Sequence, residues 1–158
     1  MVDFVAVPLI VQQRVKARKV IRQAICDLAA EQVEYAVNDL GLRGVSVGGT
    51  VLGEANSLSK YDVFWSKVEE LDVPVFMHPD NSTQLLRQGG LPARGNQGNI
   101  IGNPLETTFF LTNLIFDGVF DRFPGLTVCG GHGGGYRRWS ERRRVCVRIF
   151  VIGMRAGM

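Results

Sequence analysis

The stretch NPLETTFFLTNLIFDGVFDRFPGLTVCGGH, residues 103–132, decides the fold, because it joins one helix to one strand. Asn103 is expected to cap this helix, since a proline follows it directly and Glu106 lies three residues further on. A Phe-Pro-Gly sequence ends the helix, and the apolar run at 126–131 predicts a strand that delivers His132. Helical spacing assigns the buried face to Leu105, Phe109, Thr112, Phe116, Val119 and Phe123.

Helices and strands alternate in the same way along the preceding part of the chain. The continuous apolar run VPVFMHP, 73–79, predicts a strand covered on both faces, and it carries His78. Asp27 and Asp62 are expected to cap two further helices. The remaining expected elements are strands at 3–10 and 42–49, helices at 27–40 and 61–71, and a long loop at 80–102. The second of these helices should turn Tyr61, Phe64, Trp65, Val68 and Leu71 inward. Such alternation predicts an α/β fold with a parallel sheet, as in barrels and doubly wound proteins.

His78 and His132 are the only histidines in the sequence, and each follows a predicted strand. In parallel α/β folds, ligands and catalysis are found at this end of the strands. The glycines around His132 leave room for a substrate and leave backbone N–H groups free. Each histidine could also be a capping or hydrogen-bonded core residue. Two imidazoles alone do not make a metal site, because zinc or manganese usually takes at least three protein ligands, and no HxH or HExxH pair occurs.

Composition excludes several classes of protein. No apolar run approaches the roughly 20 residues that span a bilayer, and the first residues lack the basic region and cleavage site of a secretory signal. Cys26, Cys129 and Cys146 are widely spaced and odd in number, so neither a disulfide framework nor a thiolate zinc site is indicated. A reducing cytoplasm is the expected location. GxGxxG and GxxxxGK[ST] motifs are absent, which argues against nucleotide-phosphate cradles, and the GVSVGG stretch at 44–49 is interpreted as a strand and its tight exit.

The positive charge is concentrated in one segment. Residues 137–158 hold seven arginines and one glutamate, which leaves the rest of the chain slightly acidic. The overall net charge of +3 is therefore no argument for nucleic-acid binding. Residues 11–26 carry five positive charges and no acid, and we interpret them as a possible insert. The predicted organisation is one domain, 1–136, followed by a basic tail; a membrane- or RNA-contacting tail is the alternative.

Three segments together resemble the amidohydrolase-related metal-dependent decarboxylases, a family that includes 2-amino-3-carboxymuconate-6-semialdehyde, γ-resorcylate and 5-carboxyvanillate decarboxylases. They are LGLRGVSVG, FWSKVEELDVPVFMHP and GNPLETTFFLTNLIFDGVFDRFPGLTVCGGHGGGY, and the resemblance covers residues 3–10 and 27–136. It implies a (β/α)8 barrel with a divalent metal, zinc or else manganese, at the mouth. It also implies that His78 is a metal ligand, and that His132 contacts the metal-bound water and shuttles a proton. A small carboxylic acid is the implied substrate and a homodimer the implied assembly; neither nucleic acid nor membrane is expected.

The sequence also departs from this family. The family's first-strand HxH pair and eighth-strand aspartate have no counterpart, and the match implies about four of eight βα units, a partial TIM-type barrel. We therefore expect weak metal binding and little turnover. The predicted function is that of a carboxy-lyase fragment for an aromatic or muconate-type acid. The alternatives are a metal-dependent hydrolase of the same superfamily, and an inactive half-barrel whose basic tail binds a polyanion or a partner.

Overall fold

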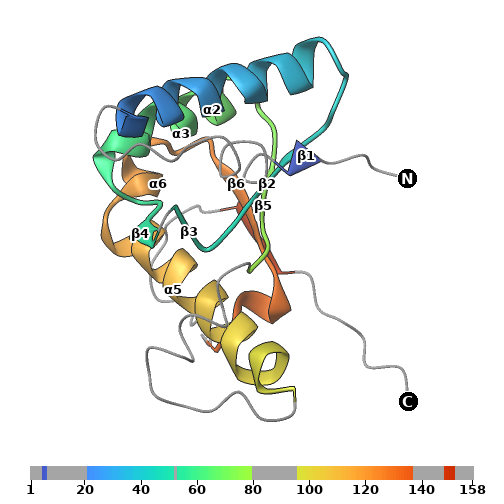
Figure 1. The fold of residues 1–158 in the computed structure, drawn as a ribbon, viewed down its shortest axis with the longest axis vertical. Helices are drawn as coiled ribbons and strands as arrows, with labels where there is room; N and C mark the ends of the chain where they lie inside the picture. Colours follow the sequence, from blue (N-terminus) through green and yellow to red (C-terminus); the bar gives the residue numbers. More distant parts are fainter. Residues whose placement is uncertain (1–4, 7–20, 52, 80–95, 137–147, 152–158) are drawn as a thin grey trace.

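A computed structural model describes residues 5–6, 21–51, 53–79, 96–136 and 148–151 (Figure 1). Within these ranges a parallel sheet is the central element, with the strand order β1-β2-β5-β6-β7. The strands are β1 (Val5–Ala6), β2 (Val45–Val47), β5 (Val75–Met77), β6 (Thr127–Gly130) and β7 (Arg148–Val151). Two further strands, β3 (Thr50–Val51) and β4 (Glu54–Ala55), form an antiparallel pair between the expected strand at 42–49 and the expected helix at 61–71, where no strand was predicted.

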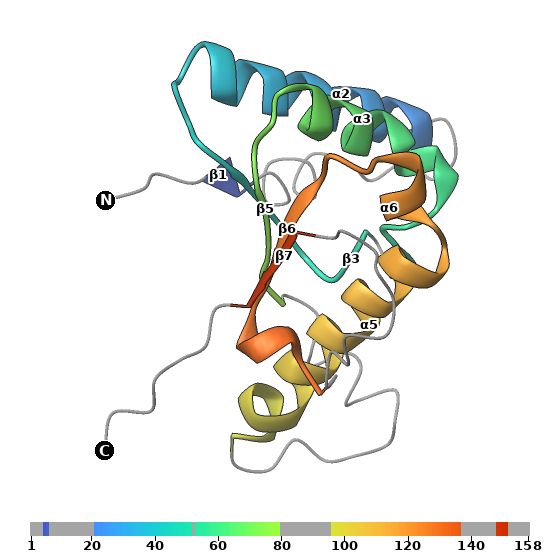
Figure 2. The ribbon, with the colours of Figure 1, turned by 180° about the vertical axis from the view of Figure 1, so that it is seen from behind.

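The helices lie to one side of the strands, as the two opposite views show (Figures 1 and 2). They are α2 (Ile21–Asn38), α3 (Asp62–Glu70), α5 (Asn103–Phe116) and α6 (Val119–Arg122). Short turns η1 (Ser59–Tyr61), η2 (Gly98–Gly102) and η3 (His132–Gly134) precede α3, precede α5 and follow β6. The predicted alternation of strands and helices is confirmed.

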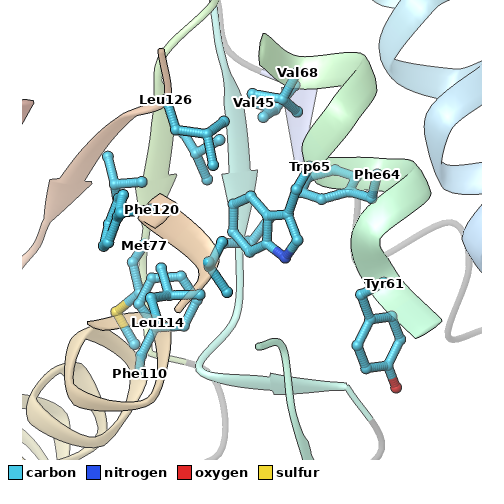
Figure 3. Close-up of a cluster of buried hydrophobic side chains, with 14 of the residues drawn as sticks. Val45, Tyr61, Phe64, Trp65, Val68, Met77, Phe110, Leu114, Phe120 and Leu126 are labelled. Carbon is cyan, nitrogen blue, oxygen red and sulfur yellow. The ribbon is translucent and has the colours of Figure 1, made fainter. Parts of the chain in front are cut away.

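Side chains of the sheet alternate between its two faces. Val45 and Val47 of β2 are buried, and so are Val75 and Met77 of β5, whereas the residues between them are only half-buried. The buried residues pack against Trp65 and its neighbours under the helices (Figure 3). The other face therefore carries the alternate residues, and His78, one step beyond Met77, falls in their register.

Trp65 lies at the centre of this core. It is 1% exposed and packs edge to face against Phe64, with ring centroids 5.1 Å apart (Figure 3). Its indole Nε1 donates a hydrogen bond to the carbonyl oxygen of Asn56 at 2.8 Å. Asn56 in turn donates to the carbonyl oxygen of Gly48 at the end of β2. A buried indole N–H needs such a partner, so the core also fixes the loop after β2. The predicted inward face of α3 is confirmed.

Three predicted helix caps are wrong, although α3 and α5 begin within one residue of the expected positions. α2 begins at Ile21, inside the segment interpreted as an insert, so Asp27 lies within the helix. α3 is preceded by a 3₁₀ turn, and Asp62 makes no capping bond but pairs with Arg122 at 3.0 Å. A turn of π-helix runs directly into α5, so Asn103 has helical dihedral angles and makes no cap. At α3 and α5, a short additional turn of helix takes the place of the capping residue, so the helix needs no side-chain cap.

The predicted buried face is wrong within α5, whereas Val119 of α6, which it also included, is buried and Phe123 is partly buried. Phe109 is 51% exposed and Phe116 is 69% exposed. The side chains that α5 buries are Glu106, Thr107, Phe110, Leu111 and Leu114. Two of these five are polar, so a pattern built on apolar residues selects the neighbouring face.

Other expectations fall partly outside the described residues. Residues 80–95 of the expected loop lie outside them. Residues 11–20 of the possible insert and residues 137–147 of the expected basic tail also lie outside them. Within the expected basic tail, β7 pairs in parallel with β6, an element that the sequence pattern did not predict. Among the described helices, none combines the length and apolar character that a bilayer span requires.

Candidate functional site

His78 is held at the carboxyl end of β5 by the backbone. Its N–H donates to the carbonyl oxygen of Val47 at 2.9 Å, so the pairing of β2 with β5 continues one residue past the strand. The residue itself is exposed, while Pro79 behind it is buried. The ladder thus fixes the backbone of His78 and leaves its imidazole accessible.

His132 is held by a turn that the strand alone could not produce. After β6 the backbone is extended at Gly131 and then takes a positive φ of 52° at His132, which is unusual for a residue other than glycine. Gly133 and Gly135 continue the turn with φ values of 67° and 77°. Gly134, with a φ of 82°, lies between them, so the three glycines that follow His132 all have a conformation that residues with a side chain rarely adopt.

This turn is packed on the first turn of α5. The backbone N–H of Tyr136 donates to Thr108 Oγ1 at 2.8 Å. A Cβ atom added at Gly135 would lie 2.5 Å from the carbonyl oxygen of Pro104, too close for any side chain. The stretches NPLETT and HGGGY, which lie at the two ends of one segment of the sequence, therefore form one packed unit.

The structure brings the two histidines together. Their ring centroids lie 6.2 Å apart with an angle of 56° between the planes. Both rings belong to the carboxyl edge of neighbouring strands, since β5 pairs directly with β6. The predicted convergence of His78 and His132 at one rim is confirmed, while their chemical roles stay predictions.

Burial lowers the pKa of His132 below its ordinary value, and the positive charge that His78 can carry lowers it further. Both effects disfavour the imidazolium form. At neutral pH His132 is therefore a neutral imidazole, able to accept a proton at one ring nitrogen.

Glu106 and Thr107 also belong to this region, although the sequence pattern gave them no such place. Glu106 is 1% exposed, and its Oε1 accepts the backbone N–H of Gly49 at 3.1 Å, which ties α5 to the end of β2. Thr107 is fully buried, with Oγ1 3.4 Å from Nδ1 of His132. The apolar residues nearby in this helix, Leu105 before them and Phe109 and Phe110 shortly after, are the signal in the sequence that could have indicated buried polar roles.

A metal site is not completed by the described residues. Among them, no three His, Cys, Asp or Glu side chains gather in a way that could hold an ion. In the described part of the chain, the His78 and His132 imidazoles meet at this edge without a third such ligand, and zinc or manganese ordinarily takes three or more protein ligands. Cys129 of β6 adds no thiolate, because burial raises the pKa of its thiol.

Comparisons with known proteins agree on one family. The sequence profile of the amidohydrolase family matches residues 11–151. The γ-resorcylate decarboxylase of Rhodococcus jostii is 35% identical over 120 residues, which cover 68% of this chain and 36% of that protein. The chain thus spans a little over one third of the length of this curated relative.

Solved structures give the same result. The crystal structure of 2,6-dihydroxybenzoate decarboxylase from Rhizobium has a TM-score of 0.58 at 30% identity, and covers 69% of this chain and 36% of that one. The dihydroxybenzoic acid decarboxylase of Polaromonas, solved with manganese and the inhibitor 2-nitroresorcinol, has a TM-score of 0.58 at 29% identity and covers 69% and 35%. The parallel sheet with helices on one side is therefore part of a (β/α)8 barrel, as predicted.

Proposed function

The chain belongs to the amidohydrolase family, and on this premise we propose that it carries part of the active site of a metal-dependent decarboxylase acting on an aromatic carboxylic acid. The observation that carries the proposal is the pair of imidazoles 6.2 Å apart at the carboxyl edge of β5 and β6. This edge is where barrel enzymes bind substrate and perform chemistry. The relatives' names supply the substrate class, a hydroxylated benzoic acid.

His132 is proposed as the proton-transfer residue. Decarboxylation breaks the bond between the ring carbon and the carboxylate, releases carbon dioxide, and leaves an electron pair on the ring carbon that must take a proton. An imidazole with a lowered pKa is neutral at rest, can take a proton from solvent and can pass it to that carbon. The neighbouring glycines leave open space on one side, since a Cβ atom at Gly133 would meet nothing within 4 Å.

His78 is proposed as one ligand of a divalent metal, with zinc and manganese as the candidates. Its exposed ring at the end of β5 is free to turn toward an ion. When bound, the metal would supply positive charge that polarises the carboxylate or a neighbouring oxygen of the substrate. The described residues alone do not complete this site, so we expect weak binding and slow turnover.

Product analysis tests the proposal. The 158-residue chain is incubated with 2,6-dihydroxybenzoate and either Mn²⁺ or Zn²⁺, and carbon dioxide and resorcinol are measured. We expect slow, metal-dependent release of both products. His132→Asn should abolish the release, because asparagine tolerates the positive φ of this residue but cannot transfer the proton. His78→Gln should weaken metal binding in calorimetry.

The matched control is Glu70→Gln, which removes an exposed carboxylate on α3 and should leave the rate unchanged. Equal product formation by the His132→Asn chain would contradict the assigned role. Addition of water to an ester or amide substrate, without carbon dioxide, would favour the hydrolase alternative. A chimera that places residues 27–136 in the Rhizobium decarboxylase gives a second test, and an inactive, folded chimera would argue against the proposal.

The domain division, the cytoplasmic location and the homodimer stay predictions.

A further inference from the structure

The hydroxyl group of buried Thr107 has three polar neighbours, and two of them can only accept a hydrogen bond. The carbonyl oxygen of Asn103 lies 3.0 Å from Oγ1, and the Sδ atom of Met77 lies 3.4 Å from it. The third neighbour is Nδ1 of His132, at 3.4 Å. A threonine hydroxyl has one proton to donate and two lone pairs with which to accept.

The single proton of Thr107 therefore has a natural destination. The Asn103 carbonyl is its nearest acceptor, one helical turn back, in the usual back-bond of a helical threonine. When Thr107 donates its proton to this carbonyl oxygen, its Oγ1 can only accept a hydrogen bond from His132. The only neighbour of Oγ1 in this set that is able to donate is the Nδ1–H group of the imidazole.

We propose that Thr107 is a positioning residue that holds neutral His132 in the tautomer protonated at Nδ1. This inference rests on the proposed function, in which His132 transfers the proton, and adds which atom does so. With Nδ1 protonated, the lone pair lies on Nε2, the ring nitrogen remote from Thr107. Nε2 is then the atom that takes up and delivers the proton.

The backbone of the same unit supports this assignment. The positive φ of His132 is held by the contact of Gly135 with α5 and by the bond from Tyr136 to Thr108. Thr107 precedes Thr108 on that helix, so one helical turn fixes both the backbone and the ring of His132. In water, free imidazole side chains prefer the proton on Nε2. A ring protonated at Nδ1 thus needs a specific acceptor such as the Thr107 hydroxyl.

Nitrogen NMR of the full, metal-free chain tests the tautomer without any substrate. The sequence has only two histidines, so ¹⁵N-histidine labelling gives two pairs of ring-nitrogen signals, and His78→Gln shows which pair belongs to His132. The spectrum is recorded near pH 8.5, about two units above the ordinary imidazole pKa, where His132, with its lowered pKa, is neutral. We expect His132 to show a protonated Nδ1 and an unprotonated Nε2.

Two variants separate positioning from packing. Thr107→Ser keeps the hydroxyl and should keep the tautomer, whereas Thr107→Val keeps the shape and should lose it, moving the proton to Nε2. Thr112→Val makes the same chemical change elsewhere on α5 and should leave the His132 signals unchanged.

An Nε2-protonated His132 in the unmodified chain would overturn the inference, whether or not the variants fold. An unchanged tautomer in folded Thr107→Val would also overturn it. Because the measurement needs neither metal nor turnover, its result is independent of whether the chain proves to be a decarboxylase.

Discussion

Replacing Gly135 by alanine should disrupt the turn that presents His132. Gly135 combines a φ of 77° with a ψ of −147°, a region that is essentially reserved for glycine. The added methyl group would also lie 2.5 Å from the Pro104 carbonyl oxygen and 2.9 Å from the backbone nitrogen of Thr108. Both obstacles are backbone atoms, so a side-chain rotation cannot relieve them.

The expected cost has two parts. A residue forced into such a conformation is strained by about 1–3 kcal/mol. Forcing a methyl group into filled space costs about 1–3 kcal/mol more. The sum, about 2–6 kcal/mol, is a large part of the roughly 5–15 kcal/mol by which native domains are stable. We therefore expect Gly135→Ala to unfold at a much lower urea concentration, or to lose the packing of the turn on α5.

Gly133→Ala is the matched control. Gly133 has a φ of 67°, but an added Cβ atom would meet nothing within 4 Å, so only the backbone term of about 1–2 kcal/mol applies. Urea unfolding of both variants, followed by far-ultraviolet circular dichroism, gives the two free energies. If Gly135→Ala destabilises the chain no more than Gly133→Ala does, the close contact of Gly135 with α5 does not constrain the turn.

Three further measurements address the neighbouring side chains. Glu106→Ala leaves the amide of the β2 loop without its acceptor and should cost about 1–3 kcal/mol in urea unfolding, while Glu106→Gln, which keeps an acceptor oxygen, should cost less. Burial lowers the pKa of His132 in the folded chain, so the unfolded chain binds more protons below pH 6.5. The free energy of unfolding should therefore fall as the pH drops through the pKa of folded His132. The decrease should be smaller in His132→Asn, and urea unfolding at several pH values measures it. Burial raises the pKa of Cys26 and Cys129, so in a Cys146→Ser background both thiols should react slowly with a disulfide reagent until urea is added; rapid reaction of the folded chain would contradict their burial.

The features of the fold that follow from continuous apolar runs could be predicted from the sequence. The runs that end at His78 and His132 are strands, and the pairing of β5 with β6 puts their ends side by side. Parallel strands share one carboxyl edge, so the convergence of two strand ends needs only the order of the elements. The length of each apolar run, the glycine and proline residues beside it and the position of each histidine were sufficient to predict that the two histidines lie at the same edge of the sheet.

The face of α5 could not be predicted in the same way. A hydrophobic pattern assumes that buried positions are apolar, but Glu106 and Thr107 are buried because each finds a partner on another element. Phe109 was placed inward by the pattern and is half exposed. The error is physical in origin, since a buried polar residue depends on contacts that are distant in the sequence and invisible to local spacing.

The same buried polar residues explain why the site depends on a helix as much as on a strand. β6 brings the chain to the edge of the sheet, but the positive φ of His132 is held by contacts with α5 rather than by the ladder. A shift of α5 along its axis would therefore move the imidazole while the sheet register stayed intact. Glu106 opposes such a shift, because its carboxylate anchors the first turn of α5 to the end of β2. The polar face of α5 therefore contributes to holding His132 at the edge where its ring lies beside that of His78.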